Sequence, residues 1–136
     1  MSVSEKIDPI YNWALKAGTM LKNRKIKTDK KEKKTDKSTV DNILSLFQSI
    51  LDPKDAALMT MMYIKRQIAR EEIEETAGHF LLQKLYEFYN NYYNDDRKLR
   101  DNISKFLTLM KWAYESKIEE EIEDFNAFIE YIRKKG

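Results

Sequence analysis

The feature of this sequence that most limits its possible folds is the scarcity of glycine and proline. The 136 residues include three glycines and two prolines. Folds rich in strands and tight turns need many more, because these two residues set the backbone angles that turns require. No stretch alternates convincingly between polar and apolar residues with the period of two that is expected of a half-buried strand. The sequence therefore predicts long helices joined by a few connections.

Two Asp-Pro pairs, at positions 8–9 and 52–53, indicate where helices begin. Aspartate is a favoured N-cap residue, and proline suits the first helical turn because its missing N–H would have no helical partner there. The first helix is expected to end near Asn23, and the helix that starts at 53 is expected to reach about Ala77. Gly78 would then follow the helix end, where a positive φ is common.

Apolar residues recur at helical spacing along most of the remaining chain. Further helices are expected from position 38 or 39, over about 79–93, and after a turn at 94–96. A last group repeats with a period close to 3.6 and contains Ile118, Ile122, Phe125, Ile129 and Ile132. This group forms either a sixth helix or a continuation of the fifth. We therefore predict an all-α protein, a compact bundle of five to six helices in a single domain spanning 1–136.

Charge is divided unevenly along the chain. Residues 22–37 include nine lysines or arginines and three acids, and Ile26 is their one apolar residue. Such a segment adds little to a core, so it is predicted to be a mobile basic loop between helices one and two. Residues 115–130 include seven acids and one lysine, which predicts an acidic C-terminal helix over 115–136. The opposed charges suggest that a basic face of one copy meets the acidic tail of the next, head to tail.

Several kinds of chemistry lack the residues they need. Cysteine is absent, which excludes disulfides and thiolate metal sites. The single histidine, His79, follows Glu72 and Glu75 at helical spacing, but di-iron helical bundles need two histidines and four carboxylates, so we expect no metal site. No nucleophile–base pair and no glycine-rich phosphate loop is recognisable. We therefore expect no catalytic residue and no cofactor, although catalysis by paired carboxylates stays open.

The sequence also bears on where the protein resides. No apolar run approaches the ~20 residues that a membrane-spanning helix needs. Residues 1–6 lack the apolar stretch of a signal peptide. Together with the absence of cysteine, these observations lead us to expect a cytoplasmic protein with no membrane partner.

Clustered lysines and arginines are the strongest candidates for a binding function. Such clusters attract phosphate at long range and need no sequence code. The candidate nucleic-acid-binding residues are Arg24, Lys25, Lys27, Lys37, Lys65, Arg66, Arg70, Arg100 and Lys105. They can line one phosphate-binding surface, or they can be ordinary solubilising charges paired with nearby glutamates. Similarly, the aromatic residues of segment 86–93 can stack bases or belong mainly to the core.

Four stretches, in this order, carry a resemblance to a known family. They are Tyr-Asn-Trp-Ala-Leu-Lys-Ala at 11–17, Lys-Ser-Thr-Val-Asp-Asn-Ile-Leu-Ser-Leu at 37–46, Tyr-Ile-Lys-Arg-Gln at 63–67 and Ile-Ser-Lys-Phe-Leu-Thr-Leu-Met at 103–110. In order and spacing they resemble the Csm-type small subunit of type III CRISPR effector complexes. The resemblance implies a non-catalytic subunit that stacks in several copies beside a guide RNA and contacts the target-strand backbone. It implies that Lys37, Lys65, Arg66 and Arg70 contact RNA.

The partners that this resemblance implies are the single-stranded target RNA or its duplex with the guide RNA, other CRISPR effector subunits and further copies of the chain. A helical protein-interaction adaptor without nucleic-acid binding is the alternative. In that case the basic segment is a solvated linker. Binding of single-stranded RNA that weakens steeply with salt would separate the two hypotheses.

Overall fold

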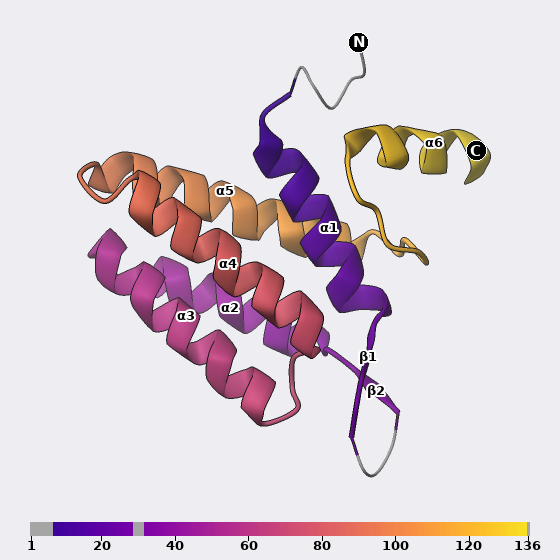
Figure 1. Cartoon of the computed structure of the whole chain (residues 1–136), viewed down its shortest axis with the longest axis horizontal. Coiled ribbons are helices and arrows are strands. Elements are labelled where there is room, and N and C mark those ends of the chain that lie inside the picture. Colours follow the sequence, from indigo (N-terminus) through magenta and orange to yellow (C-terminus); the bar gives the residue numbers. More distant parts are fainter. Residues whose placement is uncertain (1–6, 29–31, 136) are drawn as a thin grey trace.

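The computed structural model describes residues 7–28 and 32–135, which contain six helices and one two-stranded hairpin. The all-α class and the number of helices are confirmed (Figure 1). In chain order the elements are α1 (Pro9–Asn23), β1 (Lys25–Ile26), β2 (Lys33–Lys34), α2 (Lys37–Ser49), α3 (Pro53–Ala69), α4 (Glu75–Asn91), α5 (Asp96–Glu115) and α6 (Phe125–Lys135).

Three aspartates cap helices at the positions that the sequence indicated. The Asp8 carboxylate accepts a hydrogen bond from the backbone N–H of Ile10 at 2.9 Å, at the start of α1. Asp52 does the same for the N–H of Asp55 at the start of α3. At the start of α5, Asp95 is the cap. Each cap satisfies a backbone donor that the first helical turn leaves unpaired, typically contributing about 1 kcal/mol.

The core lies where α1 crosses α5 and where α2, α3 and α4 pack beside α5 (Figure 1). Gly18 permits the close crossing of α1 over α5, because a Cβ atom there would lie 2.6 Å from the Cβ of Ala113 and 2.9 Å from the backbone nitrogen of Tyr114. The apolar stripe predicted for the helix after position 96 is buried and includes Leu99, Ile103, Phe106, Met110 and Ala113. This stripe is the inner face of α5.

The predicted end of the third helix is wrong. α3 ends at Ala69, and the chain turns at Glu71, whose φ is 60°. The N–H of Glu72 donates to the carbonyl of Gln67 at 2.8 Å, which closes the turn after the helix. Gly78 is therefore an interior residue of α4. It lies where α4 packs against α3, and a Cβ there would meet the side chain of Ile68 at 2.5 Å.

The basic segment between α1 and α2 is not wholly a loop. β1 and β2 pair antiparallel, with Lys25 opposite Lys34 and Ile26 opposite Lys33. Ile26 is buried, and it anchors the hairpin to the bundle. Two-residue strands are too short to produce a visible alternation, so they could not be recognised in the sequence. Residues 29–31 of the predicted mobile loop lie outside the described residues.

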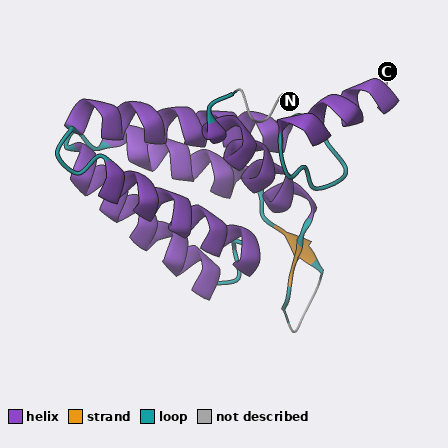
Figure 2. Cartoon of the chain, turned by 45° about the horizontal axis from the view of Figure 1, so that its top comes forward, coloured by secondary structure: helices purple, strands orange, loops and turns teal. Residues whose placement is uncertain are grey.

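The predicted acidic C-terminal helix over 115–136 is also wrong in its extent. α5 ends at Glu115, residues 116–124 are irregular, and α6 begins only at Phe125. Ile118 and Ile122 are buried although neither is helical. Most of the acids therefore lie in a connecting segment. Figure 2 shows α6 extending away from the other helices, and none of its described residues is fully buried.

Among the described residues, no helix combines the length and the apolar character needed to span a bilayer.

Candidate nucleic-acid interface

The outward face near the end of α3 carries two of the predicted binding residues. Ile64 and Gln67 of this helix are buried, so Lys65 and Arg66 between them face away from the core. Both side chains are exposed, and neither forms an ion pair with any residue that the structure describes. Arg70, one turn after Arg66, is the exposed C-cap residue of the helix. These three cations are accessible, and cations are favoured at a helix C-terminus.

Four acids follow this basic cluster directly in the sequence, and two of them have other partners. Glu72 accepts a hydrogen bond from Lys33 of β2 at 3.0 Å, which ties the hairpin to the turn between α3 and α4. Glu74 is the N-cap of α4 and accepts from the N–H groups of Thr76 and Ala77, each at 2.9 Å. Glu71 and Glu75 are exposed. The basic cluster on α3 therefore ends at a turn with two solvent-facing carboxylates.

The hairpin presents its lysines to solvent while Ile26 points inward. Lys25 and Lys27 flank Ile26 and are exposed, as strand alternation requires. Lys25 pairs across the hairpin with Glu32 at 3.0 Å, in an exposed ion pair. Lys27 has no ion pair within 7–28 and 32–135. A buried backbone N–H of Glu74 donates to the Thr35 hydroxyl at 3.1 Å, which further fixes the hairpin base.

A hollow of about 460 Å³ separates the hairpin from the end of α3. Cations from the hairpin side and carboxylates from the start of α4 face it, above an apolar floor. Its lining includes Arg24, Lys25, Lys27, Glu71, Glu74, Glu75, Ile26, Ile68 and Ile73. The structure thus brings the hairpin and the end of α3 together at one end of the molecule, as Figure 1 shows. The mixed charge of the lining means that the hollow itself is not a uniformly basic pocket.

Lys37, at the start of α2, lies in a network of ion pairs. Its ammonium contacts Asp41 at 3.0 Å and Glu115 of α5 at 3.2 Å. Lys111 contacts the same Asp41 at 3.3 Å. The hydrogen bond from Lys37 lowers the pKa of Asp41, and the same bond raises the pKa of Lys37. The side chain of Lys37 remains 60% exposed, so it is both partnered and accessible.

Arg24 also has an intramolecular partner. Its Nε and one terminal nitrogen donate to the two carboxylate oxygens of Glu121, at 2.8 and 3.1 Å. Such a two-pronged pair is among the stronger charge-assisted contacts. Hydrogen bonding to Glu121 is the main cause of the raised pKa of Arg24. Arg24 is therefore not a free cation.

Arg100 and Lys105 of α5 do not join the basic cluster on α3. Arg100 donates to the backbone carbonyls of Ile50 and Leu51, just after α2. That contact lies near the start of α3, roughly 20 Å along the helix from Arg66, at 1.5 Å per residue. Lys105 pairs with Asp8 at 3.6 Å and lies 4.7 Å from the centre of the Tyr11 ring. Arg100 and Lys105 therefore do not share one surface with Lys65 and Arg66, although such a surface was one of the two possibilities that the sequence left open.

The structure reveals a groove between α1 and α4 that sequence reasoning missed. It measures about 320 Å³ and is lined by Lys16, Met20, Arg24, Thr76, His79, Phe80, Gln83 and Glu123. Lys16 and Met20 are four apart on α1 and share one helix face, and Arg24, four residues further on, is the C-cap residue just after the helix. That spacing was visible in the sequence, but the facing residues on α4 were not. His79 is an exposed residue of this groove and lies within a helix rather than beside a helix end.

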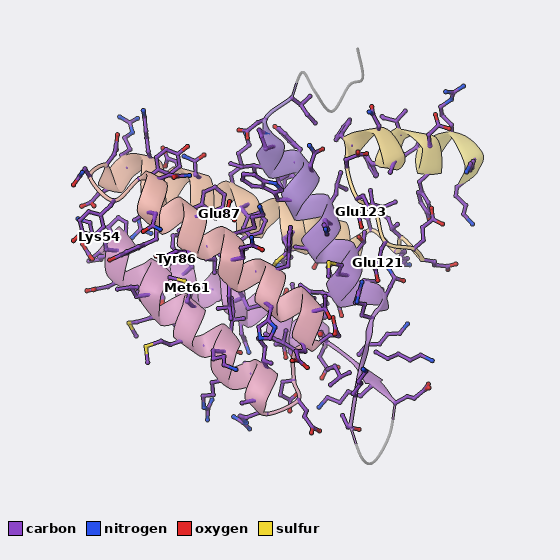
Figure 3. All side chains as sticks on the ribbon, in the orientation of Figure 1. Lys54, Met61, Tyr86, Glu87, Glu121 and Glu123 are labelled. Atoms are coloured by element: carbon purple, nitrogen blue, oxygen red, sulfur yellow. The ribbon has the colours of Figure 1, made fainter. Side chains whose placement is uncertain are left out.

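The aromatic residues of segment 86–93 are divided between core and surface. Phe88 is buried against Trp13 and Phe106, with ring centres 5.8 and 5.6 Å apart. Tyr86 and Tyr93 are exposed. Figure 3 shows Tyr86 on α4, in the part of the molecule near Met61 of α3. Two tyrosines of this segment are thus accessible.

Comparisons with known proteins leave the chain without a match: no protein-family model, no curated protein and no solved structure is significantly similar to it.

Proposed function

We propose that this protein binds the backbone of single-stranded RNA, without sequence preference, as a non-catalytic small subunit of a type III CRISPR effector complex. The observation that carries the proposal is the pair Lys65 and Arg66. Both are exposed on the outer face of a helix whose inner face is packed in the core, and neither has an ion-pair partner in the described part of the chain. Exposed cations without an intramolecular counterion can meet phosphates without first breaking an ion pair.

The charged residues around Lys65 and Arg66 indicate the path that an RNA strand would follow across the proposed interface. Arg70 follows on α3, and Lys27 lies on the hairpin side of the adjoining hollow. Glu71 and Glu75 are exposed beyond Arg70 and repel phosphate. An RNA strand that runs along α3 avoids these carboxylates, whereas a strand that crosses the turn after α3 meets them. We therefore place the RNA along the outer face of α3.

The type of recognition follows from the residue types. Lysine and arginine on a helix surface contact phosphate oxygens, which are the same for every base. Binding of this kind releases counterions and weakens with rising salt. This behaviour fits a subunit that holds whichever strand the guide RNA selects.

The proposed partners remain those that the family resemblance implies, and the proposed location remains the one expected from the sequence. They are the target strand or its duplex with the guide RNA, the other effector subunits and further copies of the chain, all in the cytoplasm. A head-to-tail contact between copies would draw on Glu119 and Glu120, which are exposed. Glu121 and Glu123 already pair with Arg24 and Lys16 of the same chain.

The direct test is fluorescence anisotropy with labelled oligouridylate and oligoadenylate in low-salt buffer. We expect the unaltered protein to bind both with similar affinity. The double substitution Lys65→Glu with Arg66→Glu is expected to abolish binding while the circular dichroism spectrum is retained, because both residues face solvent.

A matched control is available on α5. Arg97 and Lys98 are adjacent, exposed and near a helix N-terminus, where acids are favoured. Arg97→Glu with Lys98→Glu changes the net charge by the same amount and is expected to keep most of the binding. If both variants lose RNA binding equally, the loss reflects the change in net charge and not a contact at Lys65 and Arg66, which contradicts the proposal. Purification from the native host without RNA or CRISPR subunits would contradict the assignment to an effector complex.

A second candidate function, a protein-interaction adaptor, is favoured by one observation. Leu58, Met59 and Met62 are exposed on α3, and the side chain of Met62 is 74% exposed. Exposed apolar side chains gathered on one helix suit a protein partner. If the adaptor is correct, Met62→Glu will remove host proteins that co-purify with the chain, and RNA will not bind at any salt concentration.

A further inference from the structure

The groove between α1 and α4 contains two cations that are covered by carboxylates of the same chain. The guanidinium of Arg24 donates hydrogen bonds to both carboxylate oxygens of Glu121, and the Lys16 ammonium contacts the Glu123 carboxylate at 3.2 Å. Both acids come from the irregular segment between α5 and α6. Figure 3 labels Glu121 and Glu123 beside α1. One segment thus supplies a counterion to each cation on this face of α1.

The backbone of that segment is fixed independently of its acidic side chains. Ile122, between the two glutamates, is buried, and its N–H donates to the Thr19 hydroxyl at 2.9 Å. Asn23 donates to the carbonyl of Ile118 at 3.0 Å, and the N–H of Phe125 donates to Asn12 at 2.8 Å. The two carboxylates can therefore leave their cations by side-chain rotation alone, while the segment stays in place.

The geometry resembles that of a nucleic-acid strand lying on basic residues. Glu121 and Glu123 are two residues apart, with the buried Ile122 between them, and both carboxylates reach cations that line the same groove. These two neighbouring anions, each on its own cation, stand in for two phosphates of one strand.

The groove also contains polar side chains and an aromatic ring. Thr76, His79 and Gln83 line its α4 side with a hydroxyl, an imidazole and an amide. The Phe80 ring lies there too, with the Lys16 ammonium 5.0 Å from its centre. The side chain of Glu123 is 67% exposed and that of Glu121 is 31% exposed, so solvent and solutes reach both ion pairs. The exposed Lys16–Glu123 pair exchanges partners at low cost, whereas the two-pronged Arg24–Glu121 pair is stronger and yields only to a competing anion.

We propose that the α1–α4 groove is a second phosphate-binding site for single-stranded RNA, which Glu121 and Glu123 occupy until RNA displaces their side chains. This inference rests on the proposed function and adds a site and a competing segment to it. Phosphates would then take the places of the two carboxylates on Arg24 and Lys16. Intramolecular competition would make binding at this groove weaker than binding at the uncovered residues of α3.

The test compares two variants with the same change in charge. Glu121→Gln with Glu123→Gln uncovers the two cations, whereas Glu119→Gln with Glu120→Gln alters exposed neighbours that have no ion pair in the described part of the chain. Labelled oligouridylate is titrated into each in low-salt buffer. Two added phosphate contacts steepen the slope of log affinity against log salt by about 1.4, so a fourfold reduction in salt should raise the affinity of the first variant about sevenfold more than that of the unaltered protein. The second variant should match the unaltered protein.

A third variant tests whether the gain depends on the groove. Adding Lys16→Gln and Arg24→Gln to the Glu121→Gln, Glu123→Gln protein should remove the gain, and circular dichroism will verify folding. In the unaltered protein, the NMR signal of the Arg24 side-chain Nε–H should shift when RNA is added. This measurement needs no substitution, so it decides the question even if a variant unfolds.

The outcomes separate the two proposals. Equal gains in both glutamine variants, or a gain that survives loss of Lys16 and Arg24, would overturn the groove as a site. An unaltered protein that binds RNA while the Arg24 signal stays unchanged would also overturn it and would leave the α3 interface standing. Failure of both the unaltered protein and the uncovered variant to bind would overturn the proposed function together with this inference.

Discussion

Glu71 occupies a backbone position that usually belongs to glycine. It follows the C-cap of α3 with φ of 60°, in the left-handed region where a Cβ atom is strained. Glu71→Gly is expected to raise the free energy of unfolding by about 0.5–1 kcal/mol, since relief of strain exceeds the added entropy of the unfolded chain. Urea denaturation measures the change. The control Glu75→Gly, in the first turn of α4, should lower stability by a similar amount. If Glu71→Gly lowers the free energy of unfolding as Glu75→Gly does, the backbone at Glu71 is not strained.

Tyr114 connects α5 to the base of the hairpin. Its hydroxyl donates to the Thr35 carbonyl at 2.8 Å, and burial raises its pKa above the ordinary value of 10.0. A raised pKa means that the folded state holds the proton more tightly. Its contribution to stability is therefore complete below pH 10 and is lost as the pH rises through the pKa of the folded state.

Tyr114→Phe is expected to lower stability at neutral pH by about 1 kcal/mol, through the lost hydrogen bond, and to flatten the decline above pH 10. Thermal melts of both proteins from neutral to alkaline pH measure this. Tyr86→Phe, at an exposed tyrosine, is the control and should change neither value. If Tyr114→Phe declines as steeply as the unaltered protein above pH 10, Tyr114 is not the titrating group.

At the scale of elements, the two interior glycines differ in what they approach. A Cβ at Gly18 would meet the backbone of α5, whereas one at Gly78 would meet the side chain of Ile68. A backbone moves less readily than the end of a side chain. Gly18→Ala is therefore expected to cost about 2–3 kcal/mol, and Gly78→Ala clearly less, because the Ile68 side chain can move aside while the gain in helix preference is the same at both positions. Urea denaturation will rank the two. An equal or reversed order would mean that the α1–α5 crossing can adjust.

The starts of α1, α3 and α5 could be predicted from the sequence, whereas two helix ends could not, nor could the start of α4, which lies at Glu75 and not near position 79. Caps at Asp8 and Asp52 are local, because side chain and backbone lie within a few residues. The end of α3 depends on Glu71 in a conformation that glutamate rarely adopts. After α5, Ile118 and Ile122 keep helical spacing, but Lys117 has a φ of 58° and the segment packs along α1. Long-range packing there overrides a local pattern.

At the scale of the whole molecule, the sequence indicated which residues are basic but not which are available. Arg24 is paired with Glu121, 97 residues away, and Arg100 donates to carbonyls 50 and 49 residues away. No spacing rule predicts such partners. Lys65 and Arg66 could be predicted as exposed, because they lie off the apolar helical stripe that contains Ile64 and Ile68. Only the folded chain shows that they have no counterion among the described residues.

RNA binding measured over a range of salt concentrations reports how many phosphates Lys65 and Arg66 hold. Each phosphate neutralised on a single strand contributes about −0.7 to the slope of log affinity against log salt. We expect the slope of log affinity against log salt to be steeply negative for the unaltered protein and about 1.4 shallower for Lys65→Gln with Arg66→Gln. A slope that these two substitutions leave unchanged, or no binding to RNA at the lowest salt, would contradict this expectation.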